Sequence, residues 1–309
     1  MRRSKTGCMV IETKGLTFNF GNQTVVKSLS LQVPEGSIYG FLGPNGAGKT
    51  TTIKLLLNLL KTQEGDIKLF GLDFKDHRKK ILSQIGSLIE QPAIYAHLTG
   101  KENLVNRALL LQIPESRVDE MLTLVKLTAA ANKKAGNYSL GMKQRLGIAL
   151  AMLSDPKLLM LDEPTNGLDP NGIIEIRELL IRLTTQHKKT VFISSHLLGE
   201  IERMATHVGI INFGELLFQG EIKELQSISQ PMVLIETNNT VDAANLLTKN
   251  GYNVVEVKDE HLTVTYQSKE KSAQINALLN QNGHSVYSLH KVQKDLEKLF
   301  LDITQKPAK

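Results

Sequence analysis

The sequence lacks the features that mark secreted and membrane-spanning chains. Its single cysteine, Cys8, excludes an internal disulfide framework and fits a reducing compartment. No apolar run approaches the roughly 18 residues that a membrane-spanning helix needs. The basic first residues reach Glu12 before any apolar stretch develops, so we expect no signal peptide there. Internal repeats and low-complexity segments are also missing.

The composition is that of an ordinary globular protein. A chain of 309 residues has room for one large or two modest domains. With 41% hydrophobic and 22% charged residues, it has ample material for a core. The net charge of +6 favours anionic partners such as nucleotides, nucleic acid or acidic lipid, although an ordinary basic surface explains it equally well.

Up to about residue 225, apolar strand-like runs alternate with helical segments. The predicted buried strands lie at 37–43, 156–164 and 189–196, and the predicted helices at 51–60, 141–153 and 172–186. This alternation favours an α/β fold with a largely parallel sheet. Residues 15–33 read instead as short antiparallel strands beside that sheet.

After residue 230 the pattern changes. It predicts a strand, a glycine-capped helix, a hairpin turning at 258–260, a second glycine-capped helix and a strand. This β-α-β-β-α-β order is the split βαβ arrangement. A last helix is predicted at 295–304. We therefore predict two domains, at residues 9–225 and 230–309, the second a small α+β accessory domain.

The strongest local signal is GPNGAGKTT, which matches G-x-x-x-x-G-K-[ST] between a predicted strand and a predicted helix. Glycines let the backbone N–H groups face phosphate oxygens, and the helix N-terminus adds positive charge. We expect Lys49 to reach the β- and γ-phosphates of ATP and Thr50 to bind Mg²⁺. The predicted nucleotide-binding residues of this loop are Gly43, Pro44, Asn45, Gly46, Ala47, Gly48, Lys49, Thr50 and Thr51.

A second signal is LLMLDEP, in which two carboxylates end a buried strand. Asp162 needs a charged partner if it is buried, and Mg²⁺ on the phosphates would be one. Glu163 follows directly. A second carboxylate beside a Mg²⁺–nucleotide can polarise a water for in-line attack on the γ-phosphorus. The alternative is a solvated acidic turn.

Together these motifs resemble the ATP-binding subunits of ABC transporters. The motifs of the family occur in their usual order within residues 10 to about 220. They are GPNGAGKTT, IEQPAIY, YSLGMKQRL, LLMLDEP, NGLDP and SSH. The resemblance implies a P-loop ABC ATPase domain with a mixed-sheet core and a helical subdomain. It also implies that two copies pack head to tail around two ATP molecules and drive a multi-span membrane permease.

The segment YSLGM resembles the signature that separates this family from other P-loop ATPases. In the family it caps the γ-phosphate bound by the other copy. The matching residues here are Ser139, Leu140, Gly141 and Met142. The usual pattern is L-S-G-G-Q, so the serine and second glycine are kept and the first glycine is a leucine. A hydroxyl and an amide at a helix start suit a phosphate clamp. The alternative is a plain capped helix.

Three further residues gain roles from the resemblance. His196 matches the family's switch histidine, which contacts the γ-phosphate and acts with Glu163 in catalysis. Asp169, in NGLDP, matches a loop that communicates across the dimer. Phe20 matches an aromatic residue that stacks on adenine, although its ring also suits a place between strands.

The segment at 85–95 departs from the family's usual I-G-x-x-x-Q-x-P. Aligned on its flanking residues, Glu90 takes the place of the glutamine that touches Mg²⁺ and the attacking water. We therefore expect Glu90 to join Thr50 and Asp162 as a metal ligand. Gln91 is the alternative at this position.

IEQPAIY, YSLGMKQRLGIA and DLEKLFLDIT together resemble the subgroup that exports antimicrobial peptides such as lantibiotics and bacitracin. The sequence thus predicts an ATP-hydrolysing homodimer subunit on the cytoplasmic face of the membrane, held there by its permease. Two alternatives stay open. One is a peptide-antibiotic sensor, and the other is a soluble ATPase acting on nucleic acid or ribosomes. The single P-loop and the lack of sustained heptads disfavour the second, so we expect no nucleic-acid partner.

Overall fold

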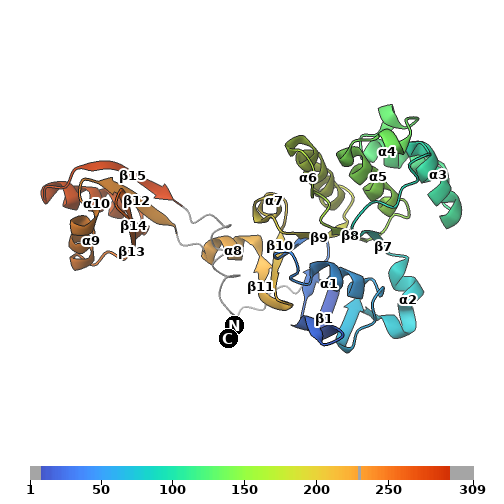
Figure 1. Ribbon diagram of the computed structural model, residues 1–309, viewed down its shortest axis with the longest axis horizontal. Coiled ribbons are helices and arrows are strands. Elements are labelled where there is room, and N and C mark those ends of the chain that lie inside the picture. The colour runs from blue at the N-terminus through green and yellow to red at the C-terminus, as the bar shows by residue number, and fades with distance from the viewer. Residues whose placement is uncertain (1–7, 229–230, 293–309) are drawn as a thin grey trace. The chain divides into compact units, whose positions relative to one another are not determined.

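A computed structural model describes residues 8–228 and 231–292 of the chain (Figure 1). The chain divides into two compact units, Met1–Ile222 and Lys223–Lys309. The first unit contains two sheets and the second contains one.

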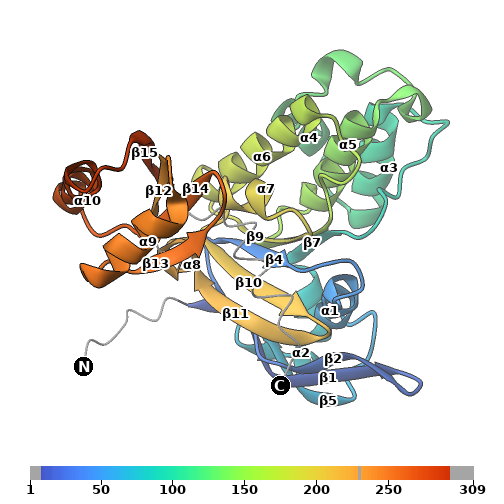
Figure 2. The ribbon, with the colours of Figure 1, turned by 60° about the vertical axis from the view of Figure 1, so that its left-hand side comes forward.

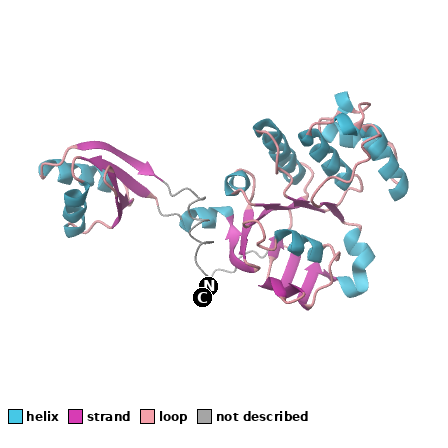
Figure 3. Cartoon of the chain, viewed as in Figure 1, coloured by secondary structure: helices cyan, strands magenta, loops and turns pink. Residues whose placement is uncertain are grey.

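The central sheet of the first unit has the strand order β11-β10-β4-β9-β8-β7. These strands are β4 (Ile38–Leu42), β7 (Ile85–Leu88), β8 (Leu158–Asp162), β9 (Thr190–Ser195), β10 (His207–Asn212) and β11 (Glu215–Glu221). All neighbours are parallel except β10 and β11, which confirms a largely parallel sheet. Every residue of β4, β8 and β9 is buried, because helices cover one face of the sheet and a helix with a second sheet covers the other (Figure 3).

The second sheet is antiparallel and has the order β2-β1-β5-β6, with β3 also pairing with β1 (Figure 2). Its strands are β1 (Met9–Phe20), β2 (Gln23–Leu29), β3 (Gln32–Pro34), β5 (Glu64–Leu69) and β6 (Leu72–Asp73). The antiparallel strands predicted within 15–33 are thus confirmed. The sequence pattern did not reveal β5, because its first three residues are polar or glycine and exposed.

Three of the helices of the first unit form a subdomain of their own. They are α1 (Lys49–Leu56), α2 (Phe74–Leu82), α3 (Gly100–Leu111), α4 (Ser116–Leu124), α5 (Leu140–Met152), α6 (Pro170–Thr185) and α7 (Leu198–Glu202), with α8 (Ile222–Ile228) following. Helices α3, α4 and α5 contact one another and form the helical subdomain. In the described part of the chain, no helix combines the length and apolarity needed to cross a membrane.

Helix α1 is shorter than the predicted 51–60. It ends at Leu56 because Asn58 takes a left-handed conformation, with φ of 53°. The N–H groups of Leu59 and Leu60 then both donate to the Lys54 carbonyl, which closes the helix end.

The second unit has the predicted β-α-β-β-α-β order. Its elements are β12 (Met232–Thr237), α9 (Thr240–Lys249), β13 (Val254–Val257), β14 (His261–Thr265), α10 (Lys269–Gln281) and β15 (Val286–Val292). The sheet order is β13-β14-β12-β15 with all neighbours antiparallel, so β14 lies between the two strands of the β12-α9-β13 crossover. Both helices share one core with alternate residues of β12 and β14. The helix predicted at 295–304 lies outside the described residues.

Candidate nucleotide-binding site

The loop between β4 and α1 requires glycine at several positions. A Cβ on Gly43 would lie 2.4 Å from the Ile211 carbonyl oxygen. Gly48, the N-cap of α1, has φ of 106°, and a Cβ there would lie 2.7 Å from the Val25 oxygen. The loop therefore closes only with these residues, in a left-handed turn leading into the helix. It borders a hollow of about 210 Å³ lined by Val25, Asn45, Gly46, Gly48, Lys49, Thr50, Thr51 and Glu163.

Lys49 is held inside this loop. Its side chain is only 6% exposed. The ammonium donates to the carbonyl oxygens of Gly43 at 2.7 Å and Pro44 at 3.1 Å. It also lies 3.2 Å from a carboxylate oxygen of Glu163. A buried cation with a single acidic partner can take up a phosphate oxygen at this position.

Asp162 ends β8 and is 3% exposed. Its two carboxylate oxygens accept hydrogen bonds from the Thr50 hydroxyl at 2.7 Å and the Ser194 hydroxyl at 2.6 Å. No lysine, arginine or histidine in the described ranges pairs with it. A buried carboxylate beside a threonine hydroxyl and without a cationic partner offers the hard oxygen ligands that Mg²⁺ prefers, so these residues fit the family's metal.

Sequence reasoning missed Ser194. Besides donating to Asp162, its hydroxyl accepts the backbone N–H of Glu163 at 2.9 Å. One β9 side chain therefore holds both consecutive acidic residues of β8 in place. The available signal was the pair of serines that ends the otherwise apolar strand VFISS.

Glu163 lies between a cation and a histidine. One carboxylate oxygen faces Lys49 and the other lies 2.8 Å from Nδ1 of His196. Glu163 has φ of 48°, a conformation that non-glycine residues adopt at an energetic cost and that is concentrated at functional sites. Its side chain is 20% exposed, so a water molecule can reach it. An oriented, solvent-accessible carboxylate can accept a proton from such a water.

The signature residues lie at the start of α5. Ser139 is the N-cap, and its hydroxyl accepts the N–H of Met142 at 3.3 Å. Leu140 is 46% exposed, and a Cβ added to Gly167 would lie 3.3 Å from its side chain. In the described part of the chain, no hydrogen bond or ion pair joins the signature residues 139–142 to the loop at 43–51.

Two other predicted residues are also separate from Lys49 and Asp162. Asp169 caps α6 by accepting the N–H of Gly172 at 3.1 Å. Phe20, at the end of β1, is 53% exposed and packs edge-on against Phe18 with ring centroids 4.9 Å apart. Its exposed ring has room to stack on a planar base, whereas Phe18 is buried.

Glu90 contacts α1 through a residue that sequence reasoning missed. Its carboxylate lies 2.8 Å from the Lys54 ammonium, and its side chain is 64% exposed. This hydrogen bond lowers the pKa of Glu90. Lys54 lies one helical turn after Thr50, but Glu90 itself makes no hydrogen bond to Thr50 or Asp162. Gln91 is exposed.

Comparisons with known proteins agree with this geometry. The family model described as ABC transporter matches residues 26–166. The bacitracin transport ATP-binding protein BcrA of Bacillus licheniformis is 41% identical over 296 residues, covering 95% of this chain and 97% of that protein. The lantibiotic transport ATP-binding protein SrtF of Streptococcus pyogenes is 36% identical over 230 residues, covering 74% of this chain and 99% of that protein.

Solved structures are similar over about 70% of the chain. CbiO1 of Clostridium perfringens, part of the ABC transporter complex cbiONQ, has a TM-score of 0.66 at 27% identity, covering 71% of this chain and 91% of that one. The ATP-binding cassette MJ0796, solved as a dimer bound to ADP and Pi, has a TM-score of 0.61 at 25% identity, covering 69% and 98%. This chain therefore belongs to the ABC transporter family, as an ATP-binding subunit that hydrolyses ATP to drive transport.

Proposed function

We propose that this chain powers a separate membrane permease that exports antimicrobial peptides, and that it is bound to that permease at the cytoplasmic face of the membrane. The observation that carries the proposal is the 41% identity to a bacitracin transport protein over 95% of this chain. The lantibiotic transport relative supports the same class of cargo. Both are transport proteins by name, which favours export over the sensing and nucleic-acid alternatives.

In this proposal the loop at 43–51 binds the phosphates of ATP. Lys49 exchanges its carboxylate partner, Glu163, for oxygens of the β- and γ-phosphates, because the triphosphate carries more negative charge. Glu163, released from the ammonium, accepts a proton from the water that attacks the γ-phosphorus. His196 holds the second carboxylate oxygen and orients it toward that water.

Thr50 and Asp162 would hold Mg²⁺, with Glu90 as a further oxygen ligand, and the metal would neutralise charge on the phosphates. Ser194 keeps the Asp162 carboxylate oriented toward Thr50. Phe20 would stack on the adenine. Because its ring is half exposed at the end of β1, a base can lie against it without rearranging the core.

The second half of each site would come from another copy of the chain. Ser139 and the Gly141 amide begin α5 and are free to face a partner's γ-phosphate. Leu140 and Met142 complete this clamp. Leu140 of the clamp lies beside Gly167, and Asp169 follows Gly167 by two residues. A movement of the clamp would therefore be passed to Asp169 through this short segment. The dimeric cassette bound to ADP and Pi supports a homodimer of this kind.

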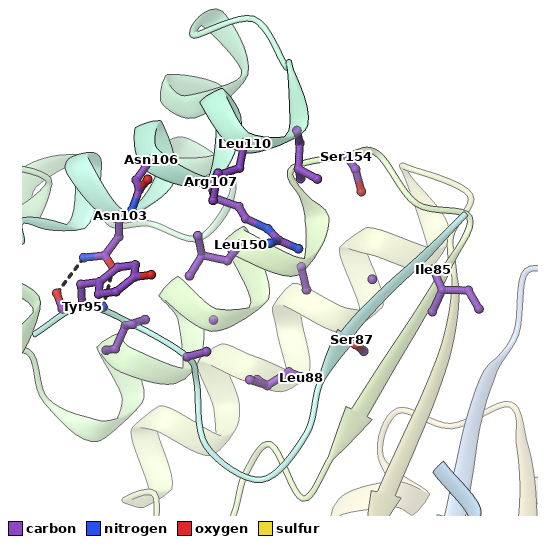
Figure 4. A pocket seen from close by; sticks show the side chains of 16 residues that line it. Ile85, Ser87, Leu88, Tyr95, Asn103, Asn106, Arg107, Leu110, Leu150 and Ser154 are labelled. Carbon is purple, nitrogen blue, oxygen red and sulfur yellow. Dashed lines mark hydrogen bonds between the residues drawn. The ribbon is translucent and has the colours of Figure 1, made fainter. Parts of the chain in front are cut away.

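A pocket of about 450 Å³ in the helical subdomain is the proposed docking site for the permease, and we name it the α3–α5 pocket (Figure 4). Its labelled lining residues are Ile85, Ser87, Leu88, Tyr95, Asn103, Asn106, Arg107, Leu110, Leu150 and Ser154. Asn103 is buried and bonds both the N–H and the carbonyl of Tyr95, so this wall is fixed. The wall continues the segment that carries Glu90, which would couple docking to the nucleotide.

The test is reconstitution of the chain with its permease in proteoliposomes. We expect bacitracin or a lantibiotic to stimulate ATP hydrolysis and to be moved in an ATP-dependent way. The Glu163→Gln variant should show neither effect. A complex that binds the peptide and signals to a kinase without moving the peptide would instead support the sensor alternative.

A further inference from the structure

Helix α2 carries a set of exposed cations that nucleotide chemistry does not use. The cations of this α2 basic surface are Lys75, Arg78, Lys79 and Lys80. All residues from 75 to 80 are exposed, and Asp76 is the only acid among them. Among the residues that the structure describes, none of the four cations forms an ion pair. Asp73, just before the helix, is paired with Lys68 at 3.9 Å.

Packed residues at both ends of α2 hold this surface in place. Ile81 is fully buried in the main core, and Phe74 packs partly buried against the same cluster. These two residues hold α2 against the first unit. The backbone is kinked at His77, with φ of −127° and ψ of 20°, so the free cations lie on two short turns that these two residues anchor.

Helix α2 leads directly into the strand that lines the α3–α5 pocket. Helix α2 ends at Leu82, and two residues later β7 begins with Ile85, which lines that pocket. Between them, the Gln84 carbonyl accepts the N–H groups of Lys157 and Leu158 at 2.9 and 3.2 Å. The connection is thus bonded to the central sheet, and the chain runs from α2 straight into the edge strand β7 (Figure 1).

We propose that the α2 basic surface contacts the anionic headgroups of the membrane when the permease occupies the α3–α5 pocket. The proposal rests on the proposed function, which holds the chain at the membrane through its permease. Clustered cations near an anionic leaflet each strengthen binding by about fivefold. Lys75 shares a hollow with Asp66, Asp73 and Asp76, so the charge complementarity comes from the consecutive cations at 78–80.

The experiment uses flotation of the full-length chain with vesicles and no permease. One set contains equal parts of phosphatidylglycerol and phosphatidylcholine, and the other contains phosphatidylcholine alone. The test variant reverses three charges, Arg78→Glu, Lys79→Glu and Lys80→Glu. The matched control reverses three other exposed lysines that form no ion pair among the described residues, Lys133→Glu, Lys188→Glu and Lys249→Glu. Circular dichroism and ATP binding check that both variants are folded.

We expect the parent and the control to bind the vesicles that contain phosphatidylglycerol. Neither should bind the vesicles of pure phosphatidylcholine. The test variant should bind at least on the order of 100-fold more weakly, because three cations worth about fivefold each are lost and three carboxylates are added. Molar salt should release the parent, since the screening length falls to about 3 Å.

Equal binding by the test variant and the parent would overturn the proposal, and so would equal loss in the control. If the test variant binds vesicles like the parent but fails to assemble with the permease, the partner of the α2 basic surface is an acidic segment of a protein and not the membrane. None of these results depends on the permease's cargo, so the proposed function can fail separately, in the transport assay.

Discussion

Replacing Glu163 with glutamine should strengthen ATP binding while stopping hydrolysis. In the structure, the Glu163 carboxylate lies 3.2 Å from the Lys49 ammonium. It therefore competes with the phosphates of ATP for this cation. The exchange of glutamate for glutamine removes one negative charge and keeps the size of the side chain. The amide can still contact His196, so the local packing is preserved.

The magnitude follows from the same distance. At 3.2 Å and an effective dielectric constant of about 20, the Coulomb attraction between Glu163 and Lys49 is about 5 kcal/mol. Desolvation cancels most of it, and a hydrogen bond between charged groups contributes about 1.5–3 kcal/mol net. Since the amide keeps part of the contact, we expect ATP binding to gain about 1–2 kcal/mol. This corresponds to an affinity about five- to thirtyfold higher.

The assay combines nucleotide titration, phosphate release and size-exclusion chromatography with Mg-ATP. We expect phosphate release to fall on the order of 10²- to 10⁴-fold, because the proton acceptor is lost, and an ATP-bound dimer to accumulate. Glu178→Gln makes the same chemical change on the surface of α6, where the carboxylate pairs with Lys126, and should alter neither quantity. Weaker ATP binding, or hydrolysis at the parent rate, would refute the assignment of Glu163.

Three further predictions concern other parts of the site. Ser139→Arg should abolish hydrolysis but leave nucleotide binding to the monomer nearly unchanged, and a collapse of monomer affinity in a titration would contradict its role in the partner's site. Glu90→Gln should make hydrolysis depend less steeply on Mg²⁺, by on the order of 1 kcal/mol in apparent affinity; a shift seen only in Gln91→Ala would move the metal ligand to Gln91. Ser194→Ala should lower the unfolding free energy by about 1–3 kcal/mol, because Asp162 loses a buried donor, and should weaken Mg²⁺ binding; an unchanged melting temperature and Mg²⁺ titration would rule this out.

The sequence by itself determined the architecture and the chemical class of the site. The phosphate loop could be read locally because the motif fixes residue types at fixed spacing, and the left-handed φ of Gly48 is a property of the loop's own backbone. The buried strand ending in Asp162 was visible as an apolar run closed by an acid. The β-α-β-β-α-β order of the second unit followed from strand and helix periodicity, which depends only on near neighbours in the chain.

Only the tertiary structure decided which side chains meet. Ser194 reaches Asp162 because β8 and β9 are adjacent in the sheet, a pairing that sequence spacing does not encode. Glu90 pairs with Lys54, 36 residues away, because the segment after β7 returns to α1. Such contacts arise from strand order and chain reversal, which are set by packing of the whole core, whereas a motif records only the residue types at fixed spacing.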